Sequence, residues 1–255
     1  MELVVKSDDG TRIALDRSGD GPPLVIVLGA FGDRSTSKPL AGLLASSYTV
    51  YEYDRRGRGD SGNGLPLSVD REVQDLSAVV ASVGESPFVY GHSSGGSLAL
   101  EAAARGVQMR RLAVYEPPYT GDRDPGPEFG RHLDELVRAG RRDEAAEQWL
   151  AATGTPPAVI ASIKTGPGWA RRQALAHTLS QDLRLANNGR VPVDRLKAIE
   201  VPLLALAGGA SPPWAASTTA TLARSLPHAG ERIVEGQQHV PADAVIAAVL
   251  EDFFV

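Results

Sequence analysis

No cysteine occurs among the 255 residues of this chain. That absence excludes disulfides, thiolate catalysis and cysteine-ligated metal sites, and it fits a reducing compartment. No apolar stretch approaches the roughly 20 residues that a membrane-spanning helix needs. The first residues, MELVVKSDDG, carry charges and lack the apolar run of a signal peptide. These absences predict a cytoplasmic protein that does not contact membranes.

A basic stripe, an internal repeat and a long low-complexity tract are also missing. The net charge is −5, so the chain has no general attraction for nucleic acid, which we exclude as a partner. Hydrophobic residues make up 42% of the sequence. That content is enough for one sizeable core, in one large domain or in one domain with an insertion.

What the sequence does contain is an alternation of apolar strands and amphipathic helices. Two short runs, ELVV and RIALD, flank the turn signal Asp9-Gly10 and predict an antiparallel hairpin. The apolar run LVIVLG then predicts a strand buried on both faces. The order of elements predicts a mostly parallel sheet with helices on both faces. Strands are expected at 48–53, 87–91, 110–116, 202–209 and 231–236, and helices at 69–84, 96–106, 213–226 and 242–254.

This rhythm is interrupted between about Tyr119 and Pro202. Residues 128–150 predict two helices around a turn, and residues 169–186 predict a further helical stretch. The proline- and glycine-rich pieces GDRDPGPEFG and TGTPPAV predict loops.

We interpret residues 119–199 as a helical cap inserted into an α/β core formed by residues 1–118 and 200–255. The insertion falls between the strand that ends at Glu116 and the strand that starts near Pro202. We expect the cap over the C-terminal edge of the sheet, where open parallel sheets bind their ligands.

The stretch Gly91-His92-Ser93-Ser94-Gly95 matches the pattern G-x-S-x-G between an apolar strand and an alanine-rich helix. At such a tight strand-to-helix turn the serine is strained and its oxygen stands clear of the sheet, while the glycines let neighbouring backbone approach. The pattern alone occurs often by chance, but the strand and the helix supply the context it requires. We therefore predict that Ser93 is a nucleophile and not an inert turn serine.

A serine hydroxyl needs a base to become nucleophilic. His239 lies in GQQHVP, in a loop between the last strand and the last helix that returns to the C-terminal edge of the sheet. We predict His239 as the base. The remaining histidines are interpreted as surface or packing residues in the first instance: His92, His132, His177 and His228.

The oxyanion formed by attack on a carbonyl needs two N–H donors. We expect one from Ser94, directly after the nucleophile. The other is expected from the loop LGAFGD after the first parallel strand, at Ala30 or, as the second choice, at Phe31. Taken alone, LGAFGD could be only a glycine-rich turn.

Residues 57–62, GRGDSG, match the dinucleotide-binding pattern G-x-G-x-x-G. Pro66 separates them from the next helix, and no acidic residue stands at the required distance on a following strand. We therefore interpret DRRGRGDSG as a packed loop with glycine turns and a network between Asp54 and arginines.

With LGAFG, YDRRGRGDS, GHSSGG and GQQH in this order, the chain resembles the α/β-hydrolase superfamily over essentially its whole length. The resemblance implies an eight-stranded sheet, a helical cap and catalysis without a cofactor or a metal. It does not identify a substrate, because this fold carries many reactions. Many members have His-Gly at the oxyanion loop, where this chain has Leu28-Gly29.

The acid of the triad departs from the common family pattern. It usually follows the strand after the cap in the context G-x-x-D, where this chain has GGAS and ends on Ser211. In the haloalkane dehalogenases the acid is a glutamate that ends the strand before the cap, and Glu116 stands at that place. We predict Glu116 as the acid, with Asp182 and Asp243 as weaker rivals. The alternative for Glu116 is a buried ion pair with an arginine such as Arg55.

These observations predict a serine hydrolase, similar to carboxylic-ester hydrolases, for an ester or lactone of a small to medium, partly apolar molecule. We expect a monomer or a homodimer with a small molecule as its partner. The candidates to line the pocket are Phe31, His92, Trp169, His177 and Trp214. For both tryptophans, cap or helix packing is the alternative.

Ser93 argues against dehalogenation and epoxide opening, which in this family use an aspartate nucleophile. Two rival functions stay open. One is a different reaction on the same site: carbon–carbon bond hydrolysis, perhydrolysis or biosynthetic cyclisation. The other is a non-catalytic binder of small molecules, which the missing aspartate at position 211 would support.

Overall fold

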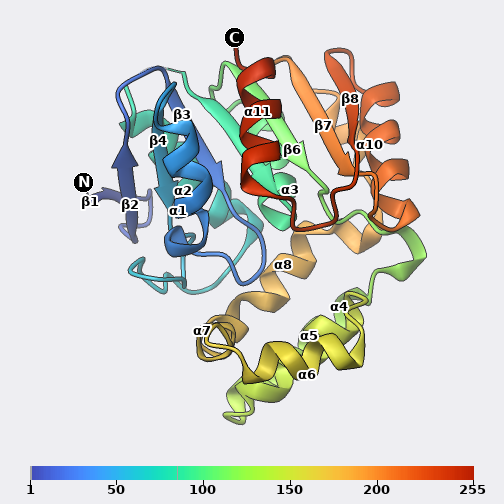
Figure 1. The fold of residues 1–255 in the computed structure, drawn as a ribbon. Coiled ribbons are helices and arrows are strands. Elements are labelled where there is room, and N and C mark those ends of the chain that lie inside the picture. The colour runs from blue at the N-terminus through green and yellow to red at the C-terminus, as the bar shows by residue number, and fades with distance from the viewer. Residues whose placement is uncertain (1, 85) are drawn as a thin grey trace.

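The computed structural model describes residues 2–84 and 86–255, which form one sheet flanked by helices (Figure 1). In these residues the sheet has eight strands in the order β1-β2-β4-β3-β5-β6-β7-β8. The β1–β2 and β2–β4 pairs are antiparallel, and the other pairs are parallel, which confirms the predicted sheet. The strands are β1 Glu2–Lys6, β2 Arg12–Ser18, β3 Pro23–Val27, β4 Thr49–Tyr53, β5 Phe88–His92, β6 Arg111–Tyr115, β7 Leu203–Gly208 and β8 Ala229–Val234.

The predicted hairpin is the β1–β2 pair. Its turn has Gly10 at φ 82°, a conformation that favours glycine, and the Asp9 side chain accepts a hydrogen bond of 3.0 Å from the Thr11 N–H. β1 alternates between exposed and half-buried residues, as expected for the edge of a sheet.

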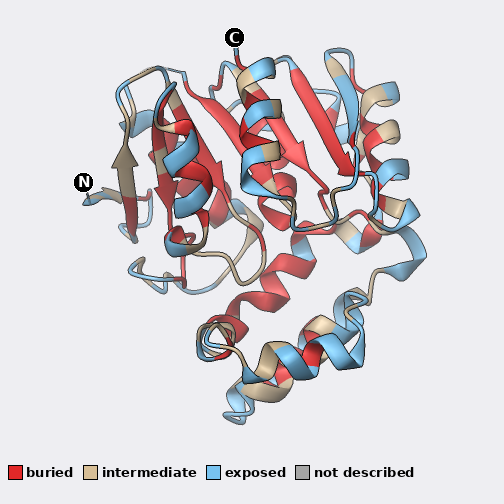
Figure 2. Ribbon diagram, viewed as in Figure 1, coloured by how far each residue is buried: buried red, intermediate tan, exposed pale blue. Residues whose placement is uncertain are grey.

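The central strands are apolar throughout because both of their faces are covered. In β3, Leu24 and Ile26 belong to the apolar layer under α1 and α11, whereas Val25 and Val27 belong to the layer under α2, α3 and α10. α1 and α11 lie in front of the sheet in Figure 1, and Figure 2 shows that the central strands behind them are buried. The helices are α1 Arg34–Leu44, α2 Val69–Ser82, α3 Ser94–Ala104, α10 Pro213–Ser225 and α11 Asp243–Phe253.

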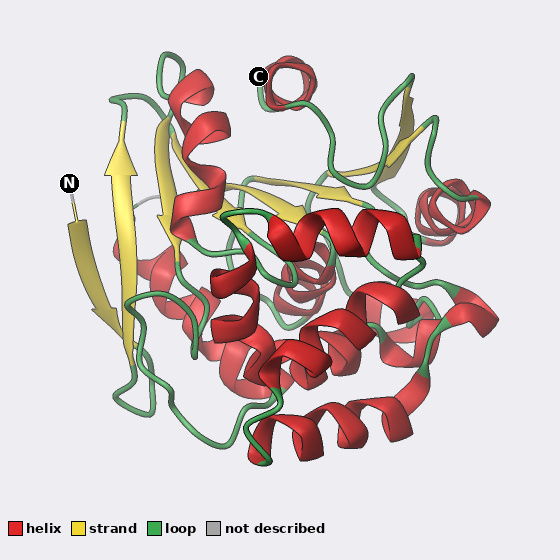
Figure 3. Cartoon of the chain, turned by 60° about the horizontal axis from the view of Figure 1, so that its bottom comes forward, coloured by secondary structure: helices red, strands yellow, loops and turns green. Residues whose placement is uncertain are grey.

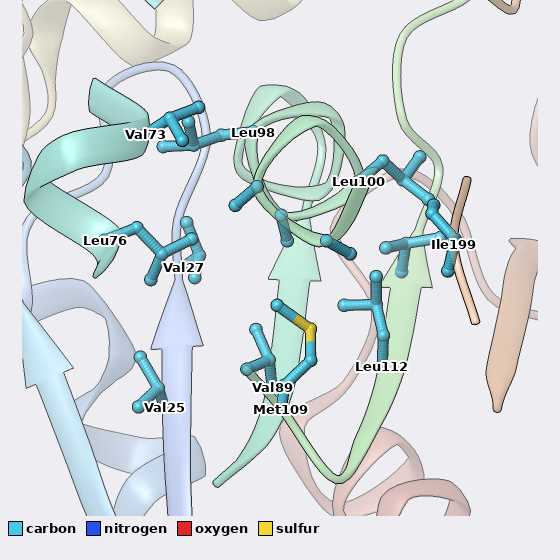
Figure 4. Packing of buried hydrophobic residues seen from close by; sticks show 14 of the residues in the cluster. Val25, Val27, Val73, Leu76, Val89, Leu98, Leu100, Met109, Leu112 and Ile199 are labelled. Carbon is cyan, nitrogen blue, oxygen red and sulfur yellow. The ribbon is translucent and has the colours of Figure 1, made fainter. Parts of the chain in front are cut away.

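Helix α3 is buried almost along its whole length. Its glycine and alanine residues let it lie close to β5 and β6, and Leu98 and Leu100 extend from opposite sides of it, toward Val73 and toward Ile199 (Figure 4). Because α3 is packed on nearly all of its surface, it fixes the position of Ser93 at its N-terminus.

The segment between β6 and β7 is helical and lies beyond the ends to which the parallel strands point (Figures 1 and 3). Most of its helices are partly exposed, but α8 lies against the core with six of its seven residues buried (Figure 2). The helices are α4 Gly126–Arg138, α5 Arg142–Ala152, α6 Pro157–Thr165, α7 Trp169–Leu175, α8 Leu179–Leu185 and α9 Val193–Leu196, with single 3-10 turns at Gly121–Arg123, Ala176–Thr178 and Asn187–Gly189.

Three local predictions need correction. The piece TGTPPAV was expected to be a loop, but α6 begins within it at Pro157, because proline fits the first position of a helix. Similarly, α4 begins at Gly126 inside the piece GDRDPGPEFG. Helix α1 was not among the predicted elements. It contains Pro39, which disfavours helix, and it is stabilised at its start by the Asp33 cap.

Candidate active site

Ser93 occupies a strained turn between β5 and α3, with φ 55° and ψ −129°. A residue other than glycine rarely adopts positive φ, so the surrounding structure must hold the backbone of Ser93 in this conformation. A Cβ atom on Gly91 would lie 2.6 Å from Gly96 Cα, and one on Gly95 would lie 2.2 Å from the Val27 carbonyl oxygen. Both glycines are therefore needed for the turn, which sets Ser93 at the C-terminal edge of the sheet.

Three side chains far apart in the sequence form one hydrogen-bonded chain at this edge. The distance from Ser93 Oγ to His239 Nε2 is 3.2 Å, and the distance from His239 Nδ1 to Glu116 Oε2 is 2.7 Å. His239 lies in the loop between β8 and α11. The structure thus brings together the three residues that were predicted as nucleophile, base and acid, in the arrangement that serine hydrolases use.

Glu116 directly follows β6, where its φ of 47° turns the side chain into the interior, and it is fully buried. Burial alone raises the pKa of this carboxyl, but His239, the neighbouring Ser211 hydroxyl and the Gly208 N–H together lower that pKa below its usual value. The Gly208 N–H donates to Glu116 Oε1 at 2.8 Å. Glu116 is therefore ionised and oriented toward His239.

The sheet register explains why Glu116, directly after β6, lies close to Ser93, directly after β5. His92 pairs with Tyr115 across the β5–β6 ladder, so Ser93 and Glu116 leave adjacent strands at the same level. Gly208 has no side chain, and a Cβ there would lie 2.3 Å from the Gln237 carbonyl oxygen. This close approach brings the His239 loop over the carboxylate.

The rivals for the acid and the base are not part of this hydrogen-bonded chain. Arg55 pairs with Glu72 and Asp182 and not with Glu116. Asp243 is the first residue of α11. Of the other histidines, His132 bonds to Gln148 on the helical segment, and His228 precedes β8.

The two segments that carry the predicted oxyanion donors both border Ser93. Ser94 is the first residue of α3, so its N–H has no acceptor within the helix. On the other side, a Cβ on Gly29 would lie 2.7 Å from Ser93 Cβ, so only glycine lets this loop approach the nucleophile. The Gly32 N–H donates to the Gly29 carbonyl at 3.1 Å and closes a turn with Ala30 and Phe31 at its centre.

The loop after β4 supplies the predicted network around Asp54, with Arg34 of α1 as its main partner. The Asp54 carboxylate accepts hydrogen bonds from the Arg34 N–H at 2.8 Å, from Arg34 Nε at 2.9 Å and from the Asp60 N–H at 2.9 Å. These contacts hold the loop that carries Arg55 and Arg58.

Asp182, on α8, is a buried acceptor directly behind the nucleophile turn. Its carboxylate accepts hydrogen bonds from Arg58 Nη2 at 2.8 Å, from Arg55 Nη1 at 2.8 Å and from the Ser94 hydroxyl at 2.7 Å. Burial by itself raises the pKa of Asp182, but the charges of Arg58 and Arg55 outweigh it and lower that pKa. The sequence suggested Asp182 only as a rival acid, and it did not predict this arrangement.

The same two arginines hold the loop that carries Ala30. Arg58 Nη1 donates to the Gly29 carbonyl and, at 3.3 Å, to the Gly32 carbonyl. Arg55 Nη1 lies 3.2 Å from the Leu28 carbonyl. Asp182 therefore connects, through two arginines and one hydroxyl, the two segments that carry the predicted oxyanion donors. The cluster of arginines in DRRGRGDSG is the signal that could have shown the need for a buried partner.

Replacing Asp182 with asparagine is expected to lower kcat by about 10- to 100-fold, less than the loss of a whole oxyanion donor. Asparagine removes the charge that both arginines need, so the Leu28–Gly32 loop is no longer fixed. Steady-state kinetics with thermal unfolding of the same samples tests this. Asp143→Asn, at a carboxylate on α5 paired with Lys164, is the control. A folded Asp182→Asn protein with the kcat of this control would contradict the assignment.

The structure separates the candidate pocket residues into two groups. Phe31 lies edge-on to Trp149 of α5 at 6.5 Å between ring centroids, and Trp214 lies 6.2 Å from the His239 ring. Both are placed next to site residues. Trp149 was missed in the sequence, since nothing in the pattern of α5 distinguishes it from a packing residue.

Trp169 and His177 are held by local contacts instead. The Trp169 indole N–H donates to Asp143 at 2.7 Å, which favours the packing alternative. His177 Nδ1 lies 2.9 Å from the Ala174 carbonyl, and its Nε2 is 3.3 Å from where a Cβ on Gly57 would be. His177 therefore lies against the loop after β4.

His92 contacts the backbone of the base. Its Nε2 lies 2.7 Å from the His239 carbonyl oxygen, so this nitrogen carries the proton and donates. Burial and the nearby His239 lower the pKa of His92 to about 4. The ring is therefore neutral near pH 7 and positions the loop that carries His239.

The half-buried, neutral His92 predicts a pH dependence of stability. Because its pKa is lower in the folded than in the unfolded protein, protonation favours unfolding as the pH falls from about 6.5 toward about 4. One proton corresponds to a slope of about 1.4 kcal/mol per pH unit. His92→Gln, which keeps an N–H donor but cannot titrate, is expected to have a shallower slope in urea unfolding across this range. An unchanged slope would contradict a neutral His92.

Comparison with known proteins identifies the family of the chain. Residues 24–251 match the model of the alpha/beta hydrolase family, and the chain belongs to that family. The solved structure of an alpha/beta hydrolase from Sphaerobacter thermophilus is 43% identical, with a TM-score of 0.94 over 99% of this chain and 100% of that one. A thermophilic esterase from Thermogutta terrifontis is 21% identical, with a TM-score of 0.77 over 100% and 98% of the two chains, and this likeness shows the fold alone.

A curated relative, the uncharacterized hydrolase YraK of Bacillus subtilis (strain 168), is 29% identical over 113 residues. The match spans 43% of this chain and 42% of that protein, less than half of its length. No helix within residues 2–84 and 86–255 combines the length and the apolar character needed to cross a membrane.

Proposed function

We propose that the protein is a serine hydrolase that cleaves an ester or lactone of a small to medium, partly apolar molecule through an acyl-enzyme. The observation that carries this proposal is the chain of hydrogen bonds from Ser93 through His239 to the buried Glu116. The same chain argues against a binder without catalytic activity, because the acid absent at position 211 has a substitute in Glu116.

In the proposed reaction, Ser93 Oγ attacks the carbonyl carbon while His239 Nε2 takes its proton. The N–H groups of Ser94 and Ala30 bind the developing oxyanion. His239 then gives the proton to the leaving alcohol, and the acyl group stays on Ser93. A water molecule, deprotonated by His239, attacks the acyl-enzyme and releases the acid. Glu116 stabilises the imidazolium of His239 during both acylation and deacylation, and it stays ionised. The steps need only residues of this chain.

We further propose that residues 119–199 act as a cap that selects the substrate. Trp149 of this segment contacts Phe31 of the oxyanion loop, and Trp214 borders His239. These aromatic groups support an acyl or alcohol part with apolar character. Among proteins of the same fold are an esterase from Rhodococcus and an enol-lactonase from Burkholderia xenovorans, at 20% and 19% identity. An esterase and a lactonase of the same fold are consistent with an ester or lactone as substrate class.

The test combines an active-site label with a substrate panel. A fluorophosphonate probe reacts with an activated serine and is expected to label the protein at Ser93. Para-nitrophenyl esters and small lactones are expected to be hydrolysed, with a burst of alcohol release if deacylation is slow. A protein that binds such compounds but neither labels nor hydrolyses any of them would be a binder. Labelling without ester or lactone turnover would favour another reaction on the same serine.

A further inference from the structure

Arg172, on α7, is a half-buried arginine without an acidic partner. Over the described residues, no carboxylate oxygen lies within 4.0 Å of its guanidinium. Its Nη1 makes one long hydrogen bond of 3.3 Å to the Gly168 carbonyl, and its buried Nε has no partner. Burial, and then the charge of Arg171, lower the pKa of this guanidinium. The positive charge at Arg172 is therefore not neutralised within the protein.

The fully buried arginines differ from Arg172 in this respect. Arg34, Arg55, Arg56 and Arg58 each have a carboxylate within 3.0 Å. Burial of a cation without a counter-ion is costly. Among the described residues, Arg111 is also half-buried without a carboxylate, but it donates to the Phe253 carbonyl at 2.6 Å. Arg172 has only the 3.3 Å contact to Gly168 and is therefore open to an anion from outside the chain.

Arg172 lies over Phe31, in the loop that carries a predicted oxyanion donor. Its guanidinium carbon is 6.0 Å from the centre of the Phe31 ring. Phe31 directly follows Ala30 in the sequence. Arg171 holds α7 on the same loop through the Ser35 hydroxyl at 3.3 Å and Asp33 at 3.9 Å. The Gly29 end of this loop touches Ser93. A guanidinium stacked on an aromatic face keeps its edge free to donate.

We propose that Arg172 binds a carboxylate of the substrate, so that the preferred substrate is an ester or lactone that carries a second, free carboxylate. The inference rests on the proposed hydrolase function and adds the substrate class. A carboxylate matches the fork of two N–H donors that a guanidinium presents, and it would neutralise the charge that the fold leaves unpaired. The reaction at Ser93 is unchanged; the second carboxylate orients the molecule beneath α7.

The alternative is that Arg172 only packs on Phe31. Arg172→Met distinguishes the two, because methionine keeps an unbranched apolar stem on the ring but removes the charge. Arg172→Lys keeps the charge without the planar fork. Arg141→Met, at an exposed arginine on the same helical segment that pairs with Glu144, is the matched control.

The experiment compares two para-nitrophenyl esters of similar length, the hemiglutarate with a free carboxylate and the neutral valerate. The wild-type protein is expected to prefer the hemiglutarate. Arg172→Met is expected to lose about 10- to 100-fold in kcat/KM for it, mainly through KM, as for a lost charge-assisted hydrogen-bonded pair. For the valerate it is expected to change by less than about 3-fold, and Arg172→Lys is expected to be intermediate. Equal losses on both esters would mean packing only.

A second measurement separates this inference from the proposed function. Free glutarate is expected to protect Ser93 from the fluorophosphonate probe in the wild type and in Arg141→Met, but not in Arg172→Met. Protection by inorganic phosphate at the same concentration would contradict the choice of a carboxylate. Labelling and valerate turnover without any effect of glutarate would overturn the role of Arg172 alone. No labelling and no turnover of either ester would overturn the hydrolase proposal and, with it, this inference.

Discussion

Replacing Ser93 with alanine is expected to reduce turnover by roughly 10⁶-fold while the protein stays folded, because attack and proton transfer both depend on the one hydroxyl. Residual activity of about 10³- to 10⁴-fold over water would come from the oxyanion donors and from binding alone. Alanine has the same backbone strain as serine at φ 55°, so thermal stability is expected to change little. Turnover of the best substrate of the panel, together with fluorophosphonate labelling, measures the effect.

Ser97 provides a matched control one turn later on the same helix. It is fully buried on α3, and no hydrogen bond of its hydroxyl to the triad is found in the described residues. Ser97→Ala is expected to keep labelling and turnover. Full labelling of the Ser93→Ala protein, or equal loss of turnover in both variants, would mean that the nucleophile is another residue.

Replacing Glu116 with glutamine is expected to lower kcat by up to about 10⁴-fold with KM changed little. Glutamine preserves the size of the side chain, and its carbonyl can still accept from the Gly208 N–H. It cannot supply the negative charge that stabilises the imidazolium of His239, and it no longer selects the tautomer with a proton on Nδ1. Single-turnover acylation kinetics isolates this loss from product release.

The position of Ser211 offers a rescue of that variant. Its hydroxyl faces the Glu116 carboxylate, so an aspartate at 211 would place a carboxylate from the next strand end close to the same point. The double variant Glu116→Gln, Ser211→Asp is expected to recover part of the lost kcat, whereas Ser211→Asn in the same background is not. If Glu116→Gln alone kept wild-type turnover while Asp182→Asn lost it, the acid would be Asp182.

Much of the fold and of the triad could be predicted because the signals are local. The apolar runs of β3 and β5 and the turn at Gly91–Gly95 each define their own conformation within a few residues. The carboxyl ends of neighbouring parallel strands meet at one edge of a sheet, so Ser93, Glu116 and His239, each placed directly after or shortly after a strand, could be expected together.

The remaining parts of the site depend on contacts between segments that no local pattern connects. Asp182 is 124 residues from Arg58 and 127 residues from Arg55 in the sequence. Only the packing of α8 against the core brings its carboxylate to these two arginines and to the Ser94 hydroxyl. Its position after a strand suggested Glu116 as the candidate acid, but the buried hydrogen bonds that orient Glu116 come from Gly208 and His239 after folding.

The sequence by itself determined the order of strands and helices along the chain, the turn at Ser93 and the loop that carries His239, because backbone preference and apolar periodicity act over short range. Only the tertiary structure decided which charges are paired. It buries Arg55 and Arg58 with a carboxylate from the helical segment and leaves Arg172 beside Phe31 with none. The physical reason is that desolvation and ion pairing depend on distances in space, which the spacing of residues along the chain does not give.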